Sequence, residues 1–374
     1  MWSHIPFDLL ANIFTYLSPD SLARSKAVCR SWLATAEFAS TLAVGRGRQP
    51  WFLALPSRSW DLSCYIHNPT ADNWHFLPLD HAISPIKPIA AIGGLLLLKN
   101  TNTTSLHLSI CNPFTKQFKA LPDLNLARTN PAVGIVANSS NQNMSGFRIY
   151  AAGGMSEAKT GGGAIYQPTV EIYDSSSQKW EMVGKMPVEI AVRLTVWTPN
   201  ESVYSNGTLY WMTSARAYSV MGLDIFTNTW RELSVPLADK LEFAALVPRN
   251  GKLAVVGGAC GGDCCVWELG DDVGGEWSLI GKVPSELGIR LSGNRESWGS
   301  VRCVGIEGAV CLYKEFGCGI IVWRDVLSGE EGWEWEWIDG CCSVGGREIK
   351  NFPIRGFLIH PNVSRCAFLN IFLN

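Results

Sequence analysis

Charged residues are scarce in this chain of 374 amino acids, and neither sign dominates. Lysine, arginine, aspartate and glutamate together make up 17% of the residues, and 31 basic against 33 acidic side chains leave a formal net charge of −2. A strong positive field is therefore absent, which argues against nucleic acid or an anionic membrane surface as a partner. The apolar fraction of 47% is enough for a buried core, so the chain is expected to be globular.

Long apolar runs are also missing. The longest, Ile89 to Leu98, is interrupted by Gly93 and Gly94 and is shorter than the roughly 20 residues that a transmembrane helix needs. The first ten residues contain no basic region followed by a long apolar stretch, so no secretory signal is recognised. We therefore expect a reducing compartment, the cytoplasm or the nucleus or both.

The sequence contains no recognisable catalytic motif and no metal-ligand spacing. Its 6 histidines are scattered, and the nearest approach to a metal pattern, Cys260 with Cys264 and Cys265, has no Cys-x2-Cys pair. Phosphate-binding loops, His-Glu-x-x-His and Gly-x-Ser-x-Gly are absent as well. These residues predict no catalytic site, no metal and no cofactor, and the 12 cysteines are interpreted as small buried hydrophobes.

Glycine and tryptophan, in contrast, are abundant, and the aromatic residues follow a repeat. An acidic or amide residue recurs six positions before an aromatic one. The pairs are Asn68 and Trp74, Asn112 and Phe118, Asp174 and Trp180, Asp224 and Trp230, and Asp271 and Trp277. A strand that ends in Asn or Asp is expected to use that side chain to cap a turn of about four residues, after which the aromatic residue of the next strand packs between sheets.

A second repeated feature is a turn glycine that precedes an apolar strand. Asn206-Gly207 and Asn250-Gly251 are dipeptides that two-residue hairpins prefer, because both central residues need a positive φ. Together the two features predict four-stranded units of about 50 residues, as in kelch-type propellers. Six aromatic landmarks, with Trp335 as the sixth, favour six blades, and seven is the alternative.

The first unit has no hairpin glycine before the strand at Trp51 to Leu55, so its innermost strand is missing from the local sequence. We expect the C-terminal region to supply it. The candidate segments are Phe357 to Ile359 and Cys366 to Phe372.

The first 40 residues differ from the rest, because their apolar residues recur at helical spacing. Leu9, Leu10, Ile13 and Leu17 define one amphipathic helix, and Ser18-Pro19 ends it and can start a second. A third helix is expected over Val28 to Ala36. The sequence therefore predicts a mainly β fold in two domains, a small all-α domain of three helices over residues 1–40 and a propeller over residues 41–374. Because so small a helical unit buries little surface, it should dock on a partner or on the propeller.

Residue identity favours a partner. The segments Ile5-Pro6, Asp8-Leu9-Leu10 and Val28-Cys29-Arg30-x-Trp32 closely resemble the F-box, the motif that binds a Skp-family adaptor. The resemblance implies that an adaptor interface includes or adjoins Pro6, Leu9, Leu10, Ile13, Leu17 and Val28, with Cys29 and Trp32 completing the packing.

The whole chain resembles the plant F-box and kelch-repeat proteins, which are substrate receptors of Skp-Cullin-F-box ubiquitin ligases. This resemblance implies a subunit without catalytic activity. Its partners would be a Skp-family adaptor, a Cullin scaffold reached through that adaptor, and a target protein that the sequence does not identify. The alternative is a kelch-type interaction scaffold with no role in ubiquitination.

In a four-stranded meander the first and third turns lie on one face of the propeller, and the other connections lie on the opposite face. Here the first and third turns are short, so the longer connections should gather on one face and carry the binding residues. Arginine, tryptophan and tyrosine are frequent in binding hot spots. The candidates for target binding are Arg193, Arg216, Tyr218, Arg290, Arg295 and Trp298.

Overall fold

Five helices and eight β-sheets, six of them four-stranded, form the fold over the residues described in the computed structural model. The structure describes residues 5–42, 49–56, 63–79, 86–140, 143–157, 163–197, 201–270, 275–293, 297–315, 318–325, 333–341, 343–344, 347–348 and 353–363. The N-terminal helices are α1 (Phe7–Thr15), α2 (Pro19–Lys26) and α3 (Arg30–Leu42). Helix α3 thus extends two residues past the boundary expected at residue 40.

Capping residues and apolar packing faces both stabilise the three helices. The Ser18 side chain accepts a hydrogen bond from the Ser21 amide at 3.3 Å, and Pro19 occupies the first turn of α2, as the sequence predicted. Leu10 and Phe14 from α1 pack against Leu22 from α2, and the Phe14 ring meets the edge of Trp32 at 5.1 Å between ring centroids. The three helices therefore share a small hydrophobic core of their own.

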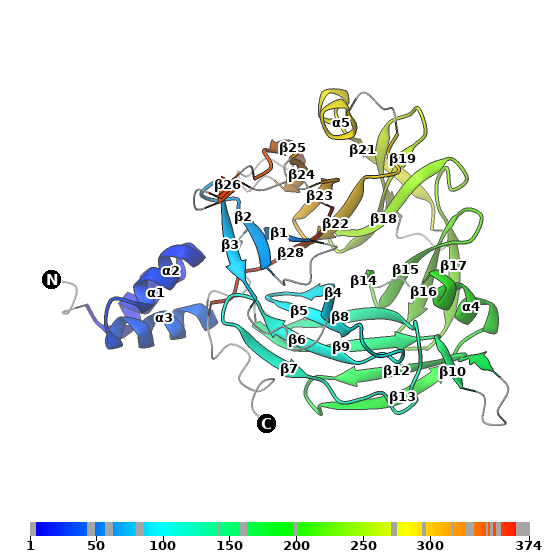
Figure 1. Cartoon of the computed structure of the whole chain (residues 1–374), viewed down its shortest axis with the longest axis horizontal. Coiled ribbons are helices and arrows are strands. Elements are labelled where there is room, and N and C mark those ends of the chain that lie inside the picture. The colour runs from blue at the N-terminus through cyan, green and yellow to red at the C-terminus, as the bar shows by residue number, and fades with distance from the viewer. Residues whose placement is uncertain are drawn as a thin grey trace.

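Most of the strands form six antiparallel four-stranded blades, which confirms the predicted six-bladed propeller (Figure 1). Blade 1 contains β28 (Ile354–Ile359), β1 (Trp51–Pro56), β2 (Ser63–Asn68) and β3 (Asn73–Pro78); blade 2 contains β4 (Ile86–Ile92), β5 (Leu95–Asn100), β6 (Leu108–Asn112) and β7 (Gln117–Ala120). Blade 3 contains β8 (Ala132–Ser140), β9 (Asn143–Ala152), β12 (Thr169–Asp174) and β13 (Lys179–Lys185); blade 4 contains β14 (Ser202–Ser205), β15 (Thr208–Ser214), β16 (Tyr218–Asp224) and β17 (Trp230–Ser234). Blade 5 contains β18 (Leu241–Arg249), β19 (Lys252–Ala259), β20 (Cys264–Leu269) and β21 (Trp277–Lys282); blade 6 contains β22 (Arg302–Ile306), β23 (Ala309–Tyr313), β24 (Ile320–Asp325) and β25 (Trp333–Ile338).

Two connections between blades are helical, although the sequence was interpreted there as loops. Helix α4 (Val188–Trp197) links blades 3 and 4, and α5 (Ser285–Ser292) links blades 5 and 6. Each follows a proline and has a glutamate in its first turn, which are helix-start signals. Two short hairpins, β10 (Met155–Glu157) with β11 (Ala164–Tyr166) and β26 (Ser343–Val344) with β27 (Arg347–Glu348), add to the blades.

The repeated turn residues act as their sequence pattern predicted. The Asn112 side chain accepts hydrogen bonds from the Phe114 and Thr115 amides at 2.9 and 3.2 Å, and Asp224 caps the equivalent turn in blade 4. Asn206-Gly207 and Asn250-Gly251 both have positive φ at each residue, as a two-residue hairpin turn requires. These turns set the register of each blade.

Tryptophans of the outer strands also bridge neighbouring blades. The indole Nε1 atoms of Trp74, Trp180 and Trp277 each donate to a backbone oxygen at the end of the preceding blade, at 3.0, 2.8 and 2.7 Å respectively. The acceptors are Asp339, Pro122 and Ser234. The recurring aromatic residue therefore supplies both packing area and a directional contact between blades.

The ring closes between the two ends of the propeller. Strand β28 pairs with β1 along its whole length, from Trp51 opposite Ile359 to Pro56 opposite Ile354. The prediction that a C-terminal segment supplies the missing inner strand is confirmed for Phe357 to Ile359, and the second candidate, Cys366 to Phe372, lies outside the described residues.

The two faces of the propeller differ in their connections. We call the face with the short turns at Gly93-Gly94, Asn206-Gly207 and Asn250-Gly251 the hairpin face. We call the opposite face, which carries α4, α5 and the β10–β11 hairpin, the loop face. Figure 1 shows α1 to α3 grouped together on one side of the propeller, well away from α4 and α5.

Two further properties concern the chain as a whole. No helix in the described ranges is both long and apolar enough to cross a membrane. Seven cysteines are buried, which agrees with their interpretation as small hydrophobes, whereas Cys29 and Cys260 are exposed. The buried cysteines are Cys64, Cys111, Cys264, Cys265, Cys303, Cys311 and Cys341.

Deletion of Gly356 to Asn374 should unfold or strongly destabilise the propeller. Phe357, Leu358 and Ile359 are buried in β28, and burial of such side chains contributes about 1.5–3 kcal/mol each. A fall in the thermal midpoint of roughly 10 °C or more is expected, measured by circular dichroism. A shorter deletion of residues 364–374 keeps β28 and is the control. An unchanged midpoint after the longer deletion would contradict closure by this strand.

Candidate functional site

The N-terminal helices present a set of apolar side chains to solvent. Leu9, Ile13 and Val28 are 54, 43 and 60% exposed, and Pro6 and Cys29 are exposed beside them. Phe7 is also half-exposed, and its ring packs on Phe38 at 5.5 Å between centroids. We call Phe7, Leu9, Ile13 and Val28 the helical patch. So many large apolar groups on one small unit are typical of a protein interface.

Three other residues that the F-box resemblance placed at or near an adaptor interface lie inward. Leu10 is buried in the core between the helices, so it adjoins the exposed surface from within. Leu17 and Trp32 are half-buried and pack against the same core. The reason is the helical period: Leu9 and Ile13 are four residues apart on one face of α1, whereas Leu10 and Phe14 share a face about 100° further around the helix.

The helical domain is attached to the hairpin face of the propeller by the segment that follows β28. The His360 amide donates to the Gly93 carbonyl at 3.0 Å, and the Asn112 side chain donates to the Asn362 carbonyl at 3.0 Å. The next residue, Val363, packs on the core of the helices, and its carbonyl accepts a hydrogen bond from Lys26. Lys26 also pairs with Glu37 at 2.7 Å. One short segment therefore contacts both domains.

On the loop face, the structure brings Arg216 and Tyr218 together with helix α4. Arg216 is exposed in the turn between β15 and β16, and Tyr218 is half-buried with its ring against the edge of Trp197, at 6.5 Å between centroids. Sequence reasoning missed the apolar residues around this pair. The exposed ones are Ile165, Tyr166, Val188, Val196 and Trp197. The sequence signal for the residues of α4 was that this segment contains more apolar residues than its inward face, with Ala191 and Leu194, can bury.

Two of the predicted arginines are engaged within the fold. Arg193 forms an ion pair with Glu232 of β17. Arg290 pairs with Asp339 at 2.7 Å and lies over the Trp337 ring at 4.1 Å from its centroid. Both side chains remain partly exposed, so each ties a connecting helix to the propeller while leaving part of its surface accessible.

Trp298, which the sequence suggested as a target-binding residue, is a core residue. It is 6% exposed, its indole Nε1 donates to the Gly262 carbonyl at 2.9 Å, and its ring lies 6.4 Å from that of Phe243. A tryptophan in a connection was expected to reach solvent, but here the connection folds back between blades 5 and 6. Arg295 lies outside the described residues.

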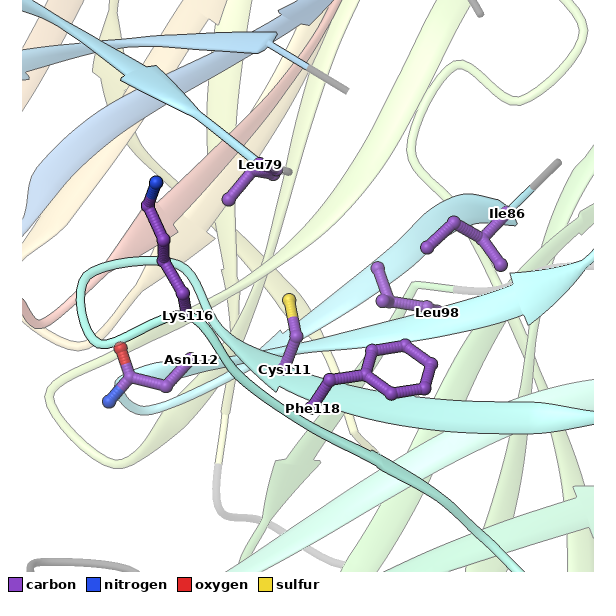
Figure 2. Close-up of a pocket in the computed structure, with 7 residues that line it drawn as sticks. All are labelled: Leu79, Ile86, Leu98, Cys111, Asn112, Lys116 and Phe118. Carbon is purple, nitrogen blue, oxygen red and sulfur yellow. The ribbon is translucent and has the colours of Figure 1, made fainter. Parts of the chain in front are cut away.

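A small, shallow pocket of about 20 Å³ opens between blades 1 and 2 (Figure 2). Leu79, Ile86, Leu98 and Phe118 provide apolar walls, and Lys116 extends from the β6–β7 turn with its amino group away from Leu98 and Phe118. The lining residues are Leu79, Ile86, Leu98, Cys111, Asn112, Lys116 and Phe118.

The polar groups of this pocket are poorly suited to chemistry. Burial raises the pKa of the Cys111 thiol to about 12, so the sulfur is protonated and a poor nucleophile at neutral pH. The Asn112 side chain already accepts a hydrogen bond from the Phe114 amide and donates one to the Asn362 carbonyl. Over the residues that the structure describes, no group of three or more His, Cys, Asp or Glu side chains is placed to hold a metal ion.

Comparison with known proteins agrees with the two-part architecture. Residues 2–37 match the family described as F-box-like, and residues 75–260 match the family described as F-box associated beta propeller domain. The Arabidopsis thaliana F-box only protein 6 is 24% identical, and the alignment covers 97% of this chain and 74% of that protein. The F-box/kelch-repeat protein At1g57790 from the same plant is 23% identical over 63% of this chain and 60% of its own length. The homologues are thus plant F-box and F-box/kelch-repeat proteins.

The inward position of Leu10 and the outward position of Ile13 can be tested by measuring the stability of their alanine variants. Leu10→Ala should destabilise the helical domain by about 2–5 kcal/mol, because it leaves a cavity in a small core. Ile13→Ala removes a side chain that is 43% exposed and should change stability by well under about 1 kcal/mol. Amide hydrogen exchange of residues 7–42 measures both. Equal loss of protection in the two variants would contradict the assigned inward and outward faces.

Proposed function

We propose that this chain, which joins an F-box-like region to an F-box-associated β-propeller, is the substrate-recognition subunit of a Skp-Cullin-F-box ubiquitin ligase. In this proposal the helical patch binds a Skp-family adaptor, through which the chain reaches a Cullin scaffold. The propeller binds the target protein. The setting would be the cytoplasm or the nucleus.

The observation that carries the proposal is the separation of the two surfaces. The helical domain contacts the hairpin face through Val363 and Lys26, whereas α4, Arg216 and Tyr218 lie on the loop face. An adaptor and a target can therefore be bound at the same time without competing for area. Joining them on one chain raises the effective concentration of the target near the ubiquitin-carrying enzyme, so binding energy replaces catalysis by this subunit.

The chemistry of the described residues supports a subunit without catalytic activity of its own. Burial raises the pKa of Cys111 and Cys311 to about 12, and it raises the pKa of Cys64, Cys264 and Cys303 as well. These thiols are protonated at neutral pH and poorly suited to carry ubiquitin as a thioester. F-box proteins typically act as adaptor subunits.

Adaptor capture tests the proposal directly. Placing a charge in the helical patch, with Ile13→Asp and Val28→Asp together, should weaken binding of a purified Skp-family adaptor by at least about 100-fold, because an interface core does not tolerate an unpaired carboxylate. Surface plasmon resonance with the full-length chain measures the affinity. Arg216→Ala, on the opposite face, is the matched control and should bind like the wild-type chain.

The same experiment separates the proposal from a kelch-type scaffold. A wild-type chain that binds no Skp-family adaptor, or a double variant that binds it normally, would refute the ligase role. The double variant also keeps its propeller, so in cells it should retain target proteins that are no longer ubiquitinated. Quantitative mass spectrometry of proteins captured by the two forms would identify those targets.

A further inference from the structure

The innermost strands of the propeller carry an excess of positive charge where they begin, at the loop face. Each inner strand runs from the loop face to the hairpin face, so the first residues of β4, β14, β22 and β28 meet around the propeller axis. Contacts between β28 and β4, β14 and β18, β18 and β22, and β22 and β28 hold these strands side by side. Lys87, Arg302 and Arg355 lie at or next to the first residues of three of them.

A fourth cation joins this group from the neighbouring strand. Lys99 of β5 is the direct partner of Lys87 in the β4–β5 register. Burial lowers the pKa of both lysines, with a further lowering of the Lys87 pKa by Arg355 and of the Lys99 pKa by Lys87. Neither lysine has a carboxylate partner in the part of the chain that the structure describes.

One carboxylate, Glu201, reaches into this group from the opposite side of the ring. It directly precedes β14 in blade 4, and its Oε1 atom lies 3.3 Å from Nη2 of Arg355 in blade 1. In a ring of six blades these two are diametrically opposed, so the ion pair spans the axis. The Glu201 side chain is 55% exposed; burial raises its pKa, and the charges of Arg355 and Arg302 oppose that rise. We call the loop-face end of the propeller axis, where these groups meet, the channel mouth.

A second carboxylate at the start of an inner strand is already engaged within the fold. Glu242, at the start of β18, already accepts hydrogen bonds from the Ser297 hydroxyl at 3.0 Å and from the Trp298 amide. The Arg355 side chain donates to the Ile89 carbonyl at 3.1 Å, but its Nε atom is buried without a partner among the described residues. Four cations therefore face one exchangeable carboxylate.

We propose that this channel mouth binds an anionic peptide segment of the target protein, with Lys87, Lys99, Arg302 and Arg355 as its cationic contacts and Glu201 as the group that the ligand displaces. The inference rests on the proposed function, because it names the class of target segment that the receptor recognises. A cluster of charges of mainly one sign concentrates opposite charge, and arginine binds carboxylate and phosphate oxygens alike. Glu201 occupies the place that a ligand carboxylate or phosphate would take.

The neighbouring surface suits a peptide. The Tyr218 hydroxyl donates to the Glu242 carbonyl at 3.4 Å, at the start of inner strand β18, which places Tyr218 near the charged mouth. Tyr218 in turn packs on Trp197, so an aromatic surface continues outward from the cations. An extended peptide could set its acidic groups at the mouth and its apolar groups on this surface.

Fluorescence anisotropy with the full-length chain tests the inference. The probes are labelled peptides of alternating glutamate and glycine, of alternating phosphoserine and glycine, and of alternating glutamine and glycine as the neutral control. One or both anionic peptides should bind, more weakly as salt rises, and the neutral one should not. A preference between glutamate and phosphoserine identifies which anion the site selects.

Two variants with opposite expected effects assign the binding to this site. Lys87→Glu with Arg302→Glu should weaken binding at least about 10-fold, whereas Glu201→Gln should strengthen it about 3-fold by removing the competing carboxylate. Lys185→Glu, at the exposed end of outer strand β13, is the matched control and should leave affinity unchanged. Thermal midpoints within a few degrees of wild type show that the variants are folded.

Failure of this inference is distinguishable from failure of the proposed function. Equal affinity of all three peptides, no effect of the double variant, or weaker binding by Glu201→Gln would overturn the anionic-peptide site. Stronger binding of a labelled oligouridylate than of either anionic peptide would overturn it in favour of nucleic acid. Adaptor binding by the same protein samples reports on the receptor role independently, since Lys87 and Arg302 lie far from the helical patch.

Discussion

The pairing of β28 with β1 is the constraint on which the rest of the molecule depends. A propeller blade exposes unpaired backbone groups at its edges, and the ring is stable only when its two ends meet. Here the last described strand of the chain becomes the first strand of the first blade. The same segment brings Arg355 to the channel mouth and continues into Val363, which packs on the helical domain. Closure, the charged mouth and the attachment of the helices therefore share one stretch of backbone.

This arrangement shows how one short segment connects the helical domain and the hairpin face of the propeller. The helices contact the propeller through the segment His360 to Val363, which is itself anchored to blade 2 by hydrogen bonds from His360 to Gly93 and from Asn112 to Asn362. Under the proposed function, a flexible linker would leave the target free to move relative to the adaptor. A segment fixed at several points limits that motion, which maintains a high effective concentration.

Local chemistry explains why sequence reasoning succeeded for the fold. The Asn or Asp that ends a strand caps its own turn, and Asn-Gly turns need only their own backbone, so both features were readable from neighbouring residues. The sequence was less informative about side chains whose neighbours in space are distant along the chain. Trp298 sits in a connection yet packs on Phe243, and the interior position of Leu10 depends on which face of α1 meets α2 and α3.

The sequence by itself determined the helical domain and the four-stranded repeat, because short-range periodicity specifies both. It favoured six blades over seven, and the missing hairpin glycine of the first unit indicated a strand from the C-terminal region. Only the tertiary structure decided which residues share a surface. Glu201 and Arg355 are 154 positions apart and meet because they lie on opposite blades. Residues brought together across the axis of a ring have no common period along the chain, so no local pattern could have grouped them.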